Sequence, residues 1–369
     1  MKIALVTIHK ANNYGALLQA YALQEALSTF GDTELVDYDN EYLSMTLEPI
    51  RVSFSFHGIL GMGKDLCRLL PRYRLIKKFK KFMAKRFVMT QSYSQNELLK
   101  NKLPGYDYYV VGSDQVWNST CVSRTSDHDP VYFLEFAPEG AKKVSYASSV
   151  GGYVFTEEES KQIPKYIDSF EAVSVREKNT QKYLNSLTGK NIEHVLDPTL
   201  LLSKNQWEEL VGQTEYTDNR PYILLYTVPK VALVRKAVAH FSDKLGVRVI
   251  AIDQGLSAGA CVDKHIRDAG PEDLLSLFSG ADFVVTDSFH GVCFSINLER
   301  PFVALSPGKH ANRVESLLSI VGLNEQYVSN ELDFDGVSLK IDFSEPRLRL
   351  EKARKESYQF LHQAFSTGI

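Results

Sequence analysis

Residues 2–38 read KIALVTIHKANNYGALLQAYALQEALSTFGDTELVDY, and this stretch decides the fold. The short apolar run at 3–8 predicts a buried parallel strand. A polar loop at 9–14 then leads into 15–28, where apolar residues recur at helical spacing. Another apolar run, at 34–38, predicts the next strand. This strand–helix–strand unit is the usual beginning of a doubly wound parallel sheet.

The alternation continues along the chain in two series. Further strands are predicted at 108–111, 144–147, 172–175 and 192–196. From about residue 220 the second series has predicted strands at 222–227, 247–252, 283–286 and 302–305, and predicted helices at 231–245, 271–278, 291–298 and 312–321. Two such series predict an α/β fold with two Rossmann-like domains that face each other across a cleft.

The length of 369 residues also fits two domains. The polar stretch 213–220, QTEYTDNR, is the best candidate linker. We therefore expect an N-terminal domain at 1–212 and a C-terminal domain at 213–344. The charged segment 345–369 predicts a helix that packs back on the first domain.

Composition excludes several classes of protein. There are 42 Lys and Arg against 45 Asp and Glu, a net charge of −3, which argues against a dedicated nucleic-acid binder. The four cysteines are widely spaced and form no CxxC, so neither a zinc knuckle nor a dithiol redox centre is indicated, and they fit a reducing cytoplasm. No His, Asp or Glu pair has metal-ligand spacing, so no metal is expected. No apolar run has the length of a signal peptide core or a membrane span, so we expect a cytoplasmic protein.

The near-neutral total conceals one strongly basic segment. Residues 64–87 read KDLCRLLPRYRLIKKFKKFMAKRF, with ten Lys and Arg and one acid, Asp65. This segment carries +9, which leaves −12 for the remaining chain. Interleaved apolar residues predict a basic amphipathic helix, broken at Pro71. Such a helix binds anionic membrane surfaces or acidic partners; the alternative is a solvated helix pair on the surface.

Two loops after predicted strands of the first domain are candidate ligand sites. HKANNYGALLQ (9–19) opens a helix, whose free N–H groups at Asn12, Asn13, Tyr14 and Gly15 suit an anion or a sugar hydroxyl. The alternative is that Asn13 only caps the helix and Gly15 permits a tight turn. This loop lacks GxGxxG and the Walker A pattern.

The second loop is VVGSDQVWN (110–118). Ser113, Asp114 and Gln115 suit a hydroxyl-rich ligand, and Trp117 offers a flat face to a sugar ring. The alternative places Trp117 in the hydrophobic core behind a capped helix.

Charged residues after three further strands complete the candidate set. Arg176, in SVREKNT (174–180), is placed to clamp a carboxylate or phosphate, or to form a salt bridge with Glu177 or Glu171. His290, in TDSFHGVCFSI (286–296), is a candidate general acid or base at the start of a helix.

Three further residues extend the site around that histidine. Gly291 would let a ligand approach the backbone. Lys309 and Arg313, in SPGKHANR (306–313), follow the next strand and are expected to reach the same cleft.

Seven ordered blocks resemble the polysaccharide pyruvyl transferase family: NNYGALLQAYAL, YDYYVVGSDQVWN, KVSYASSVG, SVREKNT, HVLDPTLLL, VVTDSFHG and PFVAL. They run from about Lys2 to Leu323. The resemblance implies a GT-B-like fold and transfer of a pyruvyl group from phosphoenolpyruvate to two hydroxyls of a sugar, as a cyclic ketal. The sugar would belong to a bacterial capsular, exopolysaccharide or cell-wall precursor.

The resemblance also implies roles for particular residues. His290 matches the family's histidine, whereas Ser288 stands where the family's Arg-Leu-His type motif has arginine, and Phe289 where it has leucine. Arg176 matches the family's arginine after the strand of the N-domain. We expect His290 to act as the acid and Arg176, Arg313 or Lys309 to hold phosphoenolpyruvate beside Ser288 and Phe289.

The N-terminal loops would then meet the acceptor through Asn12, Asn13, Tyr14, Gly15, Ser113, Asp114, Gln115 and Trp117. No cofactor beyond the donor is expected. The expected partner is a polyprenyl-diphosphate-linked oligosaccharide at an anionic inner-membrane surface, which the basic segment would contact. Two alternatives stay open: a GT-B glycosyltransferase that uses a nucleotide sugar, and a non-catalytic carbohydrate-binding relative.

Overall fold

The computed structural model describes residues 1–50, 63, 66, 68–125, 127–212, 214–216, 220–308 and 311–366. The chain forms two compact units. Unit 1 comprises Met1–Leu47, Arg86–Leu201 and Glu351–Ile369, and unit 2 comprises Glu48–Lys85 and Leu202–Leu350. In the described part of the chain, no helix combines the length and apolar character needed to cross a membrane.

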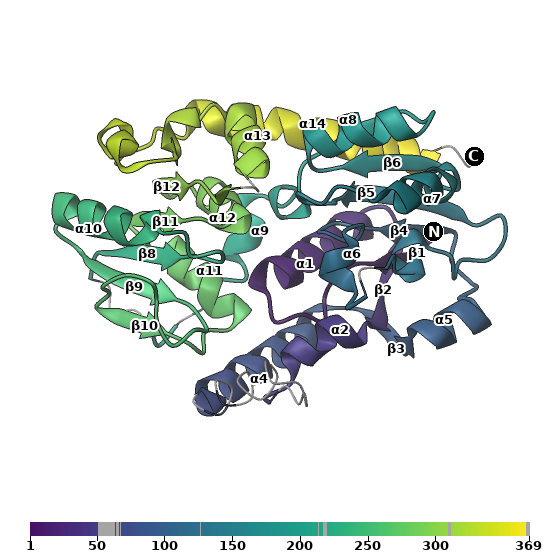
Figure 1. Cartoon of the computed structure of the whole chain (residues 1–369), viewed down its shortest axis with the longest axis horizontal. Helices are drawn as coiled ribbons and strands as arrows, with labels where there is room; N and C mark the ends of the chain where they lie inside the picture. Colours follow the sequence, from purple (N-terminus) through teal and green to yellow (C-terminus); the bar gives the residue numbers. More distant parts are fainter. Residues whose placement is uncertain are drawn as a thin grey trace. The chain divides into compact units, whose positions relative to one another are not determined.

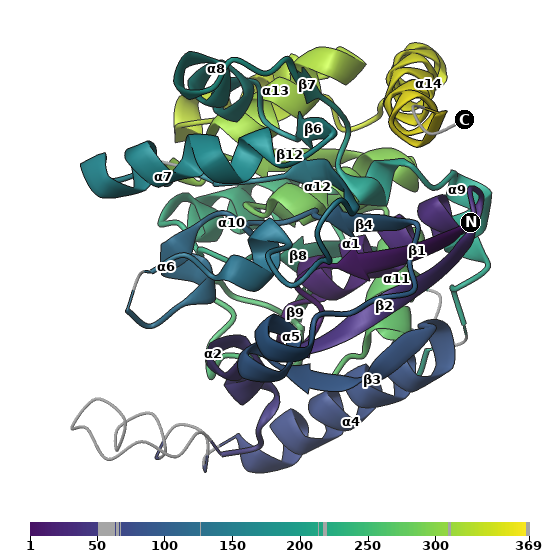
Figure 2. The same ribbon diagram turned by 90° about the vertical axis from the view of Figure 1, so that its right-hand side faces the viewer.

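Unit 1 is built on a seven-stranded sheet in the order β3-β2-β1-β4-β5-β6-β7, and its pairings are all parallel (Figure 2). The strands are β1 (Lys2–Val6), β2 (Asp32–Asp39), β3 (Met89–Ser94), β4 (Tyr108–Val111), β5 (Lys142–Ser148), β6 (Ala172–Val175) and β7 (Ile192–His194). Its helices are α1 (Tyr14–Ser28), α2 (Glu41–Ser44), α5 (Gln95–Asn101), α6 (Ser119–Val122), α7 (Glu157–Asp168) and α8 (Lys178–Leu187), with most of α14 (Ser344–Ser366).

Unit 2 repeats the same topology. Its parallel sheet has the order β10-β9-β8-β11-β12-β13, which Figure 1 shows from β10 up to β12. The strands are β8 (Tyr222–Tyr226), β9 (Arg248–Ile252), β10 (Lys264–Ile266), β11 (Phe283–Thr286), β12 (Phe302–Leu305) and β13 (Tyr327–Val328). The helices are α4 (Leu69–Arg86, which ends in unit 1), α9 (Lys204–Glu208), α10 (Leu233–Leu245), α11 (Pro271–Ser279), α12 (Phe289–Asn297) and α13 (Ala311–Val321).

The two sheets have the strand order of a Rossmann fold, in which successive strands are added first on one side of the starting strand and then on the other. We call the place where the side changes the reversal point. The reversal lies between β1 and β4 in unit 1 and between β8 and β11 in unit 2. All four residues of β4 and of β11 are buried, as expected for central strands covered on both faces. The α/β fold with two Rossmann-like domains predicted from the sequence is confirmed.

The boundaries differ from those expected at 212 and 344. Helix α9 belongs to unit 2, where Trp207 packs edge-on against Phe294 of α12 with ring centres 5.3 Å apart. Helix α14 changes units at Leu350 rather than at 344, and its part from Glu351 onward belongs to unit 1, the domain against which this segment was predicted to pack. There Phe365 meets the ring of Tyr108 with centres 4.9 Å apart, and the Ser357 hydroxyl accepts the N–H of Leu196 at 3.0 Å.

The basic helix α4 also differs from expectation, because most of it belongs to unit 2 rather than to the first domain. Its lysine Lys78 forms an ion pair of 2.8 Å with Asp273, and Lys85 forms one of 3.1 Å with Glu272. Pro71 lies in the first turn of α4, where proline is tolerated, and so does not break it. Lys64, Asp65 and Cys67 lie outside the described residues, as do Gln213 and 217–219 of the expected linker.

Candidate functional site

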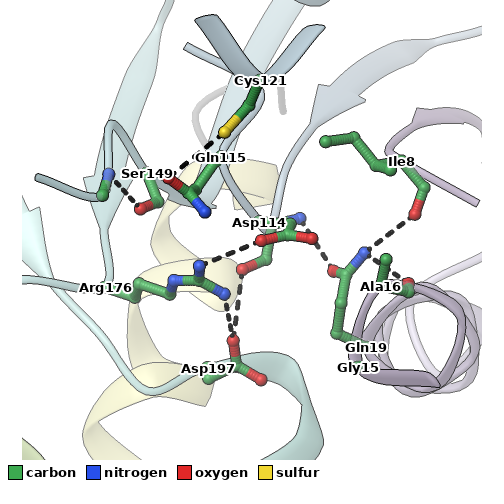
Figure 3. Close-up of polar contacts among 12 residues, drawn as sticks. Ile8, Gly15, Ala16, Gln19, Asp114, Gln115, Cys121, Ser149, Arg176 and Asp197 are labelled. Atoms are coloured by element: carbon green, nitrogen blue, oxygen red, sulfur yellow. Dashed lines mark hydrogen bonds and ion pairs between the residues drawn. The ribbon is translucent and has the colours of Figure 1, made fainter. Parts of the chain in front are cut away.

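The reversal point of unit 1 carries the first group of candidate residues. Open α/β sheets bind ligands outside the carboxyl ends of the strands at such a point. Gln19 of α1 ties the loops after β1 and β4 together there. Its Nε2 donates to the Ile8 carbonyl at 3.3 Å (Figure 3) and to the Thr7 hydroxyl at 2.8 Å, and its Oε1 accepts the N–H of Ser113 at 3.2 Å. The Ser113 hydroxyl donates to the carbonyl of Ala147 at 3.0 Å. The loops after β1, β4 and β5 are therefore held in one hydrogen-bonded network.

Arg176, which follows β6, lies inside this network. Its guanidinium forms ion pairs with Asp197 at 2.7 Å and Asp114 at 3.1 Å (Figure 3), and with Glu177 at 3.0 Å, and its side chain is 0% exposed. Burial alone would lower the pKa of Arg176, but the three carboxylates raise it above its usual value. Three acids around one cation leave an excess of negative charge. A phosphate at this position would meet carboxylates, so the structure favours the salt-bridge alternative, with Glu177 but not Glu171 among the partners.

Trp117 is a core residue. It is 1% exposed and stacks on Phe133, with ring centres 5.7 Å apart and planes 5° apart. Its indole N–H donates to the carbonyl of Tyr132 at 3.0 Å. The ring presents no free face to a sugar, which corrects the expectation that it contacts the acceptor. The neighbouring Gln115 accepts the amide of Asn118 at 2.9 Å.

In the loop that opens α1, the structure favours the alternative in which Asn13 caps the helix. The side chain of Asn13 accepts the N–H groups of Gly15 at 2.9 Å and Ala16 at 3.3 Å, so Asn13 caps the helix. Tyr14 is buried in the first turn, and the N–H of Asn12 donates to the Thr46 hydroxyl at 2.8 Å. These N–H groups already have acceptors within unit 1, and an anion would have to displace them.

The reversal point of unit 2 carries the second group. Strand β11 ends at Thr286, and Ser288 is the N-cap of α12, its hydroxyl accepting the N–H of Gly291 at 3.5 Å. Asp287 accepts the N–H of Val228 at 2.8 Å and that of Val231 at 3.1 Å. Burial raises the pKa of Asp287, and these N–H donors act against that shift. Asp287 thus fixes the loop after β8 beside the start of α12.

His290 lies in the first turn of α12 and is 9% exposed. Its ring lies edge-on to the ring of Phe289, with centres 5.4 Å apart. Arg313 of α13 places its guanidinium carbon 5.6 Å from the centre of the Phe289 ring, a cation–π contact. The structure therefore brings His290, Phe289 and Arg313 together. Lys309 lies outside the described residues.

Packing against the sheet, rather than the expected approach of a ligand, explains the glycine at position 291. A Cβ at this position would lie 2.1 Å from the Thr286 hydroxyl oxygen and 3.1 Å from Cδ1 of Tyr226. Only glycine lets α12 sit this close to β11 and β8. The side of α12 that carries Gly291 faces the sheet. This close packing fixes the position of His290 relative to the end of β11.

Sequence reasoning missed one polar cluster in unit 2. The ammonium of Lys230, after β8, lies 2.6 Å from Asp253 Oδ2, after β9, and Nε2 of His265 lies 3.2 Å from the Asp253 carbonyl. Burial would raise the pKa of Asp253, but its bonds to His265 and Lys230 lower it. The available signal was that Asp253 comes directly after β9 and Lys230 lies in the loop after β8. No group of three metal-ligating side chains occurs in the described residues.

Known structures share this fold. The UDP-N-acetylglucosamine 2-epimerase of Rickettsia bellii matches with 9% identity and a TM-score of 0.51, over 98% of this chain and 96% of that one. A glycosyltransferase from Streptomyces sp. SF2575, complexed with thymidine diphosphate, matches with 11% identity and a TM-score of 0.43, over 97% and 96%.

An O-GlcNAc transferase from Thermobaculum terrenum matches with 13% identity and a TM-score of 0.45, over 99% of this chain and 64% of that chain. The chain thus spans less than two thirds of that protein. The match to the Rickettsia bellii epimerase, together with the two parallel sheets, confirms the expected α/β fold class.

Sequence comparison identifies the family. No match was found among curated proteins. The family model described as polysaccharide pyruvyl transferase matches residues 13–309, which include α1, β4, β11 and His290. Since this match covers most of the chain, the chain belongs to the polysaccharide pyruvyl transferase family.

Proposed function

We propose that this transferase moves the pyruvyl group of phosphoenolpyruvate onto two hydroxyls of a sugar in a surface polysaccharide precursor. The product is a cyclic ketal, and phosphate is released. The observation that supports this proposal most is the position of His290. It follows the central strand β11 at the reversal point of unit 2, next to Phe289 and Arg313, within a chain of the pyruvyl transferase family.

The proposed reaction begins with protonation of the donor. His290 gives a proton to C3 of the enol, which makes C2 electrophilic. A sugar hydroxyl attacks C2, the bond from C2 to the phosphate oxygen breaks, and a second hydroxyl closes the ketal. One hydroxyl proton balances the proton now on C3, and the other leaves with phosphate. This sequence uses an acid and cations, and its reactants are phosphoenolpyruvate and the sugar.

Arg313 is our candidate for the cation that the family's arginine would supply at Ser288. Its guanidinium lies over Phe289, the residue between Ser288 and His290. Lys309 stays a candidate from the sequence. We assign Arg176 instead to the internal network of unit 1, because three carboxylates surround its buried guanidinium.

The acceptor is proposed to be an oligosaccharide on a polyprenyl diphosphate. Unit 1 is the proposed acceptor side, through the loops after β1 and β4. Asp114 and Ser113 there are 8% and 0% exposed, so their side chains position the loop backbone and do not contact the sugar directly.

The proposal is tested by incubating the full chain with phosphoenolpyruvate and lipid-linked glycans. We expect phosphate release and a glycan mass increased by one pyruvate less one water. His290→Gln should lower the rate by about two to four orders of magnitude, as expected for loss of a general acid. His240→Gln, at a half-exposed histidine of α10, is the matched control and should keep the activity.

Two outcomes would contradict the proposal. A glycan modified by a nucleotide sugar, with no response to phosphoenolpyruvate, would identify a glycosyltransferase instead. If His290→Gln transferred the pyruvyl group at the full rate, the proposed reaction would stand but His290 would not be its general acid.

A further inference from the structure

A pocket of about 570 Å³ opens in unit 1 at the carboxyl ends of β2 and β3. Its walls come from the starts of α2 and α5 and from described residues of the segment 122–130. None of the acceptor candidates chosen from the sequence lines it. Its volume lies in the range of small-molecule sites, and its place outside the carboxyl ends of parallel strands is where such sheets bind ligands.

The floor of the pocket is a rigid polar network around the buried carboxylate of Asp129. This carboxylate accepts the Tyr38 hydroxyl at 2.7 Å, Asn40 Nδ2 at 2.9 Å, the N–H of Val131 at 3.0 Å and Gln95 Nε2 at 3.1 Å. Burial raises the pKa of Asp129, against these donors. Side chains from β2, α5 and the 122–130 segment are thereby fixed before any ligand arrives, which lowers the entropy cost of binding.

The charges on the walls select the class of ligand. Asp39, Glu41 and Asp127 line the pocket with a single arginine, Arg124. This excess of acid disfavours an anion such as phosphoenolpyruvate, and the polar walls disfavour a lipid chain. Carboxylates beside a guanidinium suit hydroxyl groups, which both donate and accept.

Two further features favour a sugar. Tyr42 lines the pocket with a side chain 38% exposed, so part of its ring is open to a ligand. Among the described residues, Oδ1 of Asp39 is buried from solvent and has no hydrogen-bond partner, so this carboxylate has an acceptor that a sugar hydroxyl reaching it would satisfy. A sugar ring presents apolar C–H faces to an aromatic ring and hydroxyls to carboxylates at its edge.

We propose that this pocket binds a neutral sugar residue of the polysaccharide acceptor. Tyr42 provides the stacking face, and Asp39 and Arg124 bind hydroxyls. The pocket holds a sugar of the acceptor chain as an anchoring subsite in unit 1, whereas His290 belongs to unit 2. The identity of the polymer rests on the proposed function; the existence of a sugar site does not.

The test is saturation-transfer difference NMR on the full chain with methyl β-D-glucopyranoside, methyl β-D-galactopyranoside and methyl α-D-mannopyranoside. At least one should bind, and Tyr42→Ala should weaken that binding about three- to tenfold, the value of one aromatic contact. Tyr42→Phe keeps the ring and should bind as the original chain does. Tyr73→Ala removes a tyrosine that is 54% exposed on α4 and is the control.

The outcomes separate this proposal from the proposed function. Sugar binding that is lost in Tyr42→Ala, in a chain that does not use phosphoenolpyruvate, keeps the pocket and refutes the pyruvyl transfer. No binding of any glycoside, or equal binding by Tyr42→Ala with its fold intact by circular dichroism, overturns the pocket. Saturation transfer to putrescine in place of the sugars would identify a cation pocket and overturn it too.

Discussion

Arg176 shows how a residue chosen for a ligand can belong to the structure. Its guanidinium is enclosed by Asp114, Glu177 and Asp197 inside unit 1. Replacing it by methionine would leave three buried carboxylates without their cation. We expect Arg176→Met to lower the free energy of unfolding by about 3–5 kcal/mol, the cost of breaking a buried ion pair from one side. Urea unfolding followed by circular dichroism measures this change.

An exposed arginine of α4 is the matched control for that measurement. The side chain of Arg74 is 60% exposed and lies 3.5 Å from Asp268. Arg74→Met should therefore change the free energy of unfolding by less than about 1 kcal/mol. If Arg176→Met were instead stable and had a raised KM for phosphoenolpyruvate, Arg176 would bind the donor, as the sequence suggested.

The sequence could predict where Arg176 stands but not what it does. Its position directly after an apolar run is visible in SVREKNT. Two of its partners lie 62 and 21 residues away, and only the folded sheet brings them to the guanidinium. Trp117 was ambiguous for the same reason, since Phe133 and Tyr132 make it a core residue. His290 could be placed correctly because its strand and its helix are adjacent in sequence.

At the scale of elements, the contact between α12 and β11 fixes the position of His290. A Cβ on Gly291 would overlap the Thr286 hydroxyl at 2.1 Å, so the helix must shift to accommodate it. We expect Gly291→Ala to cost about 1–3 kcal/mol of stability, as overpacking does, and to lower kcat for pyruvyl transfer. Thermal unfolding and steady-state kinetics measure the two effects.

Gly336 offers the comparison, because a Cβ there would meet no atom within 4 Å. Gly336→Ala should leave both quantities unchanged. If Gly291→Ala had ordinary stability but lost donor binding alone, the glycine would serve ligand approach, as first expected, rather than helix packing.

Helix α4 presents a different surface from the one its sequence suggested. Its apolar side, with Leu75, Ile76 and Phe79, is buried in the protein and is not available to a bilayer. The exposed side carries Lys77, Lys80 and Lys81. The proposed contact with an anionic membrane therefore depends on charge, with Leu70 and Tyr73 as its exposed apolar residues; they are 60% and 54% exposed.

The combined variant Lys77→Glu, Lys80→Glu and Lys81→Glu tests this contact. Each basic residue near an anionic surface contributes about fivefold in affinity, so binding to vesicles with anionic lipid should fall by about two orders of magnitude. Reversal of three exposed lysines elsewhere, Lys100, Lys178 and Lys352, is the control. Equal co-sedimentation of both variants would make α4 an ordinary solvated surface, while activity on a soluble acceptor should be unaffected.

Elements with a strong apolar period were predictable, and weakly patterned ones were not. The strands 108–111, 172–175, 283–286 and 302–305 occur as predicted, because each is a buried apolar run. Strand β3, MTQSYS, was missed since it is an edge strand with no buried residue and so needs no apolar pattern. Strand β13 has only two residues.

At the scale of the whole molecule, two sheets of the same strand order each create one reversal point. The alternation of strands and helices predicted both sheets, because it is repeated locally along the chain. It could not assign α4 to its unit, since Lys78 meets Asp273 across 195 residues of sequence. Nor could it reveal the pocket of unit 1, whose walls come from three separate segments.

The proposed assignment of donor and acceptor to separate units gives the last prediction. If unit 2 holds the donor, phosphoenolpyruvate should slow hydrogen exchange in the loops at 227–231 and 286–292, because ligand binding raises the cost of opening its site. The amides at 38–42 and 94–96 should respond to the methyl glycoside that binds and not to phosphoenolpyruvate. Mass spectrometry of the full chain, digested after exchange, reads both sets in one experiment.

The unchanged set in each arm serves as its control. Protection of the amides at 174–178 by phosphoenolpyruvate would show that the donor binds near Arg176, despite the excess of negative charge around its guanidinium. Protection of 286–292 by a nucleotide sugar, without any by phosphoenolpyruvate, would keep the site and change its donor. The pattern of protection thus tests the donor, the acceptor pocket and their assignment to separate units independently of one another.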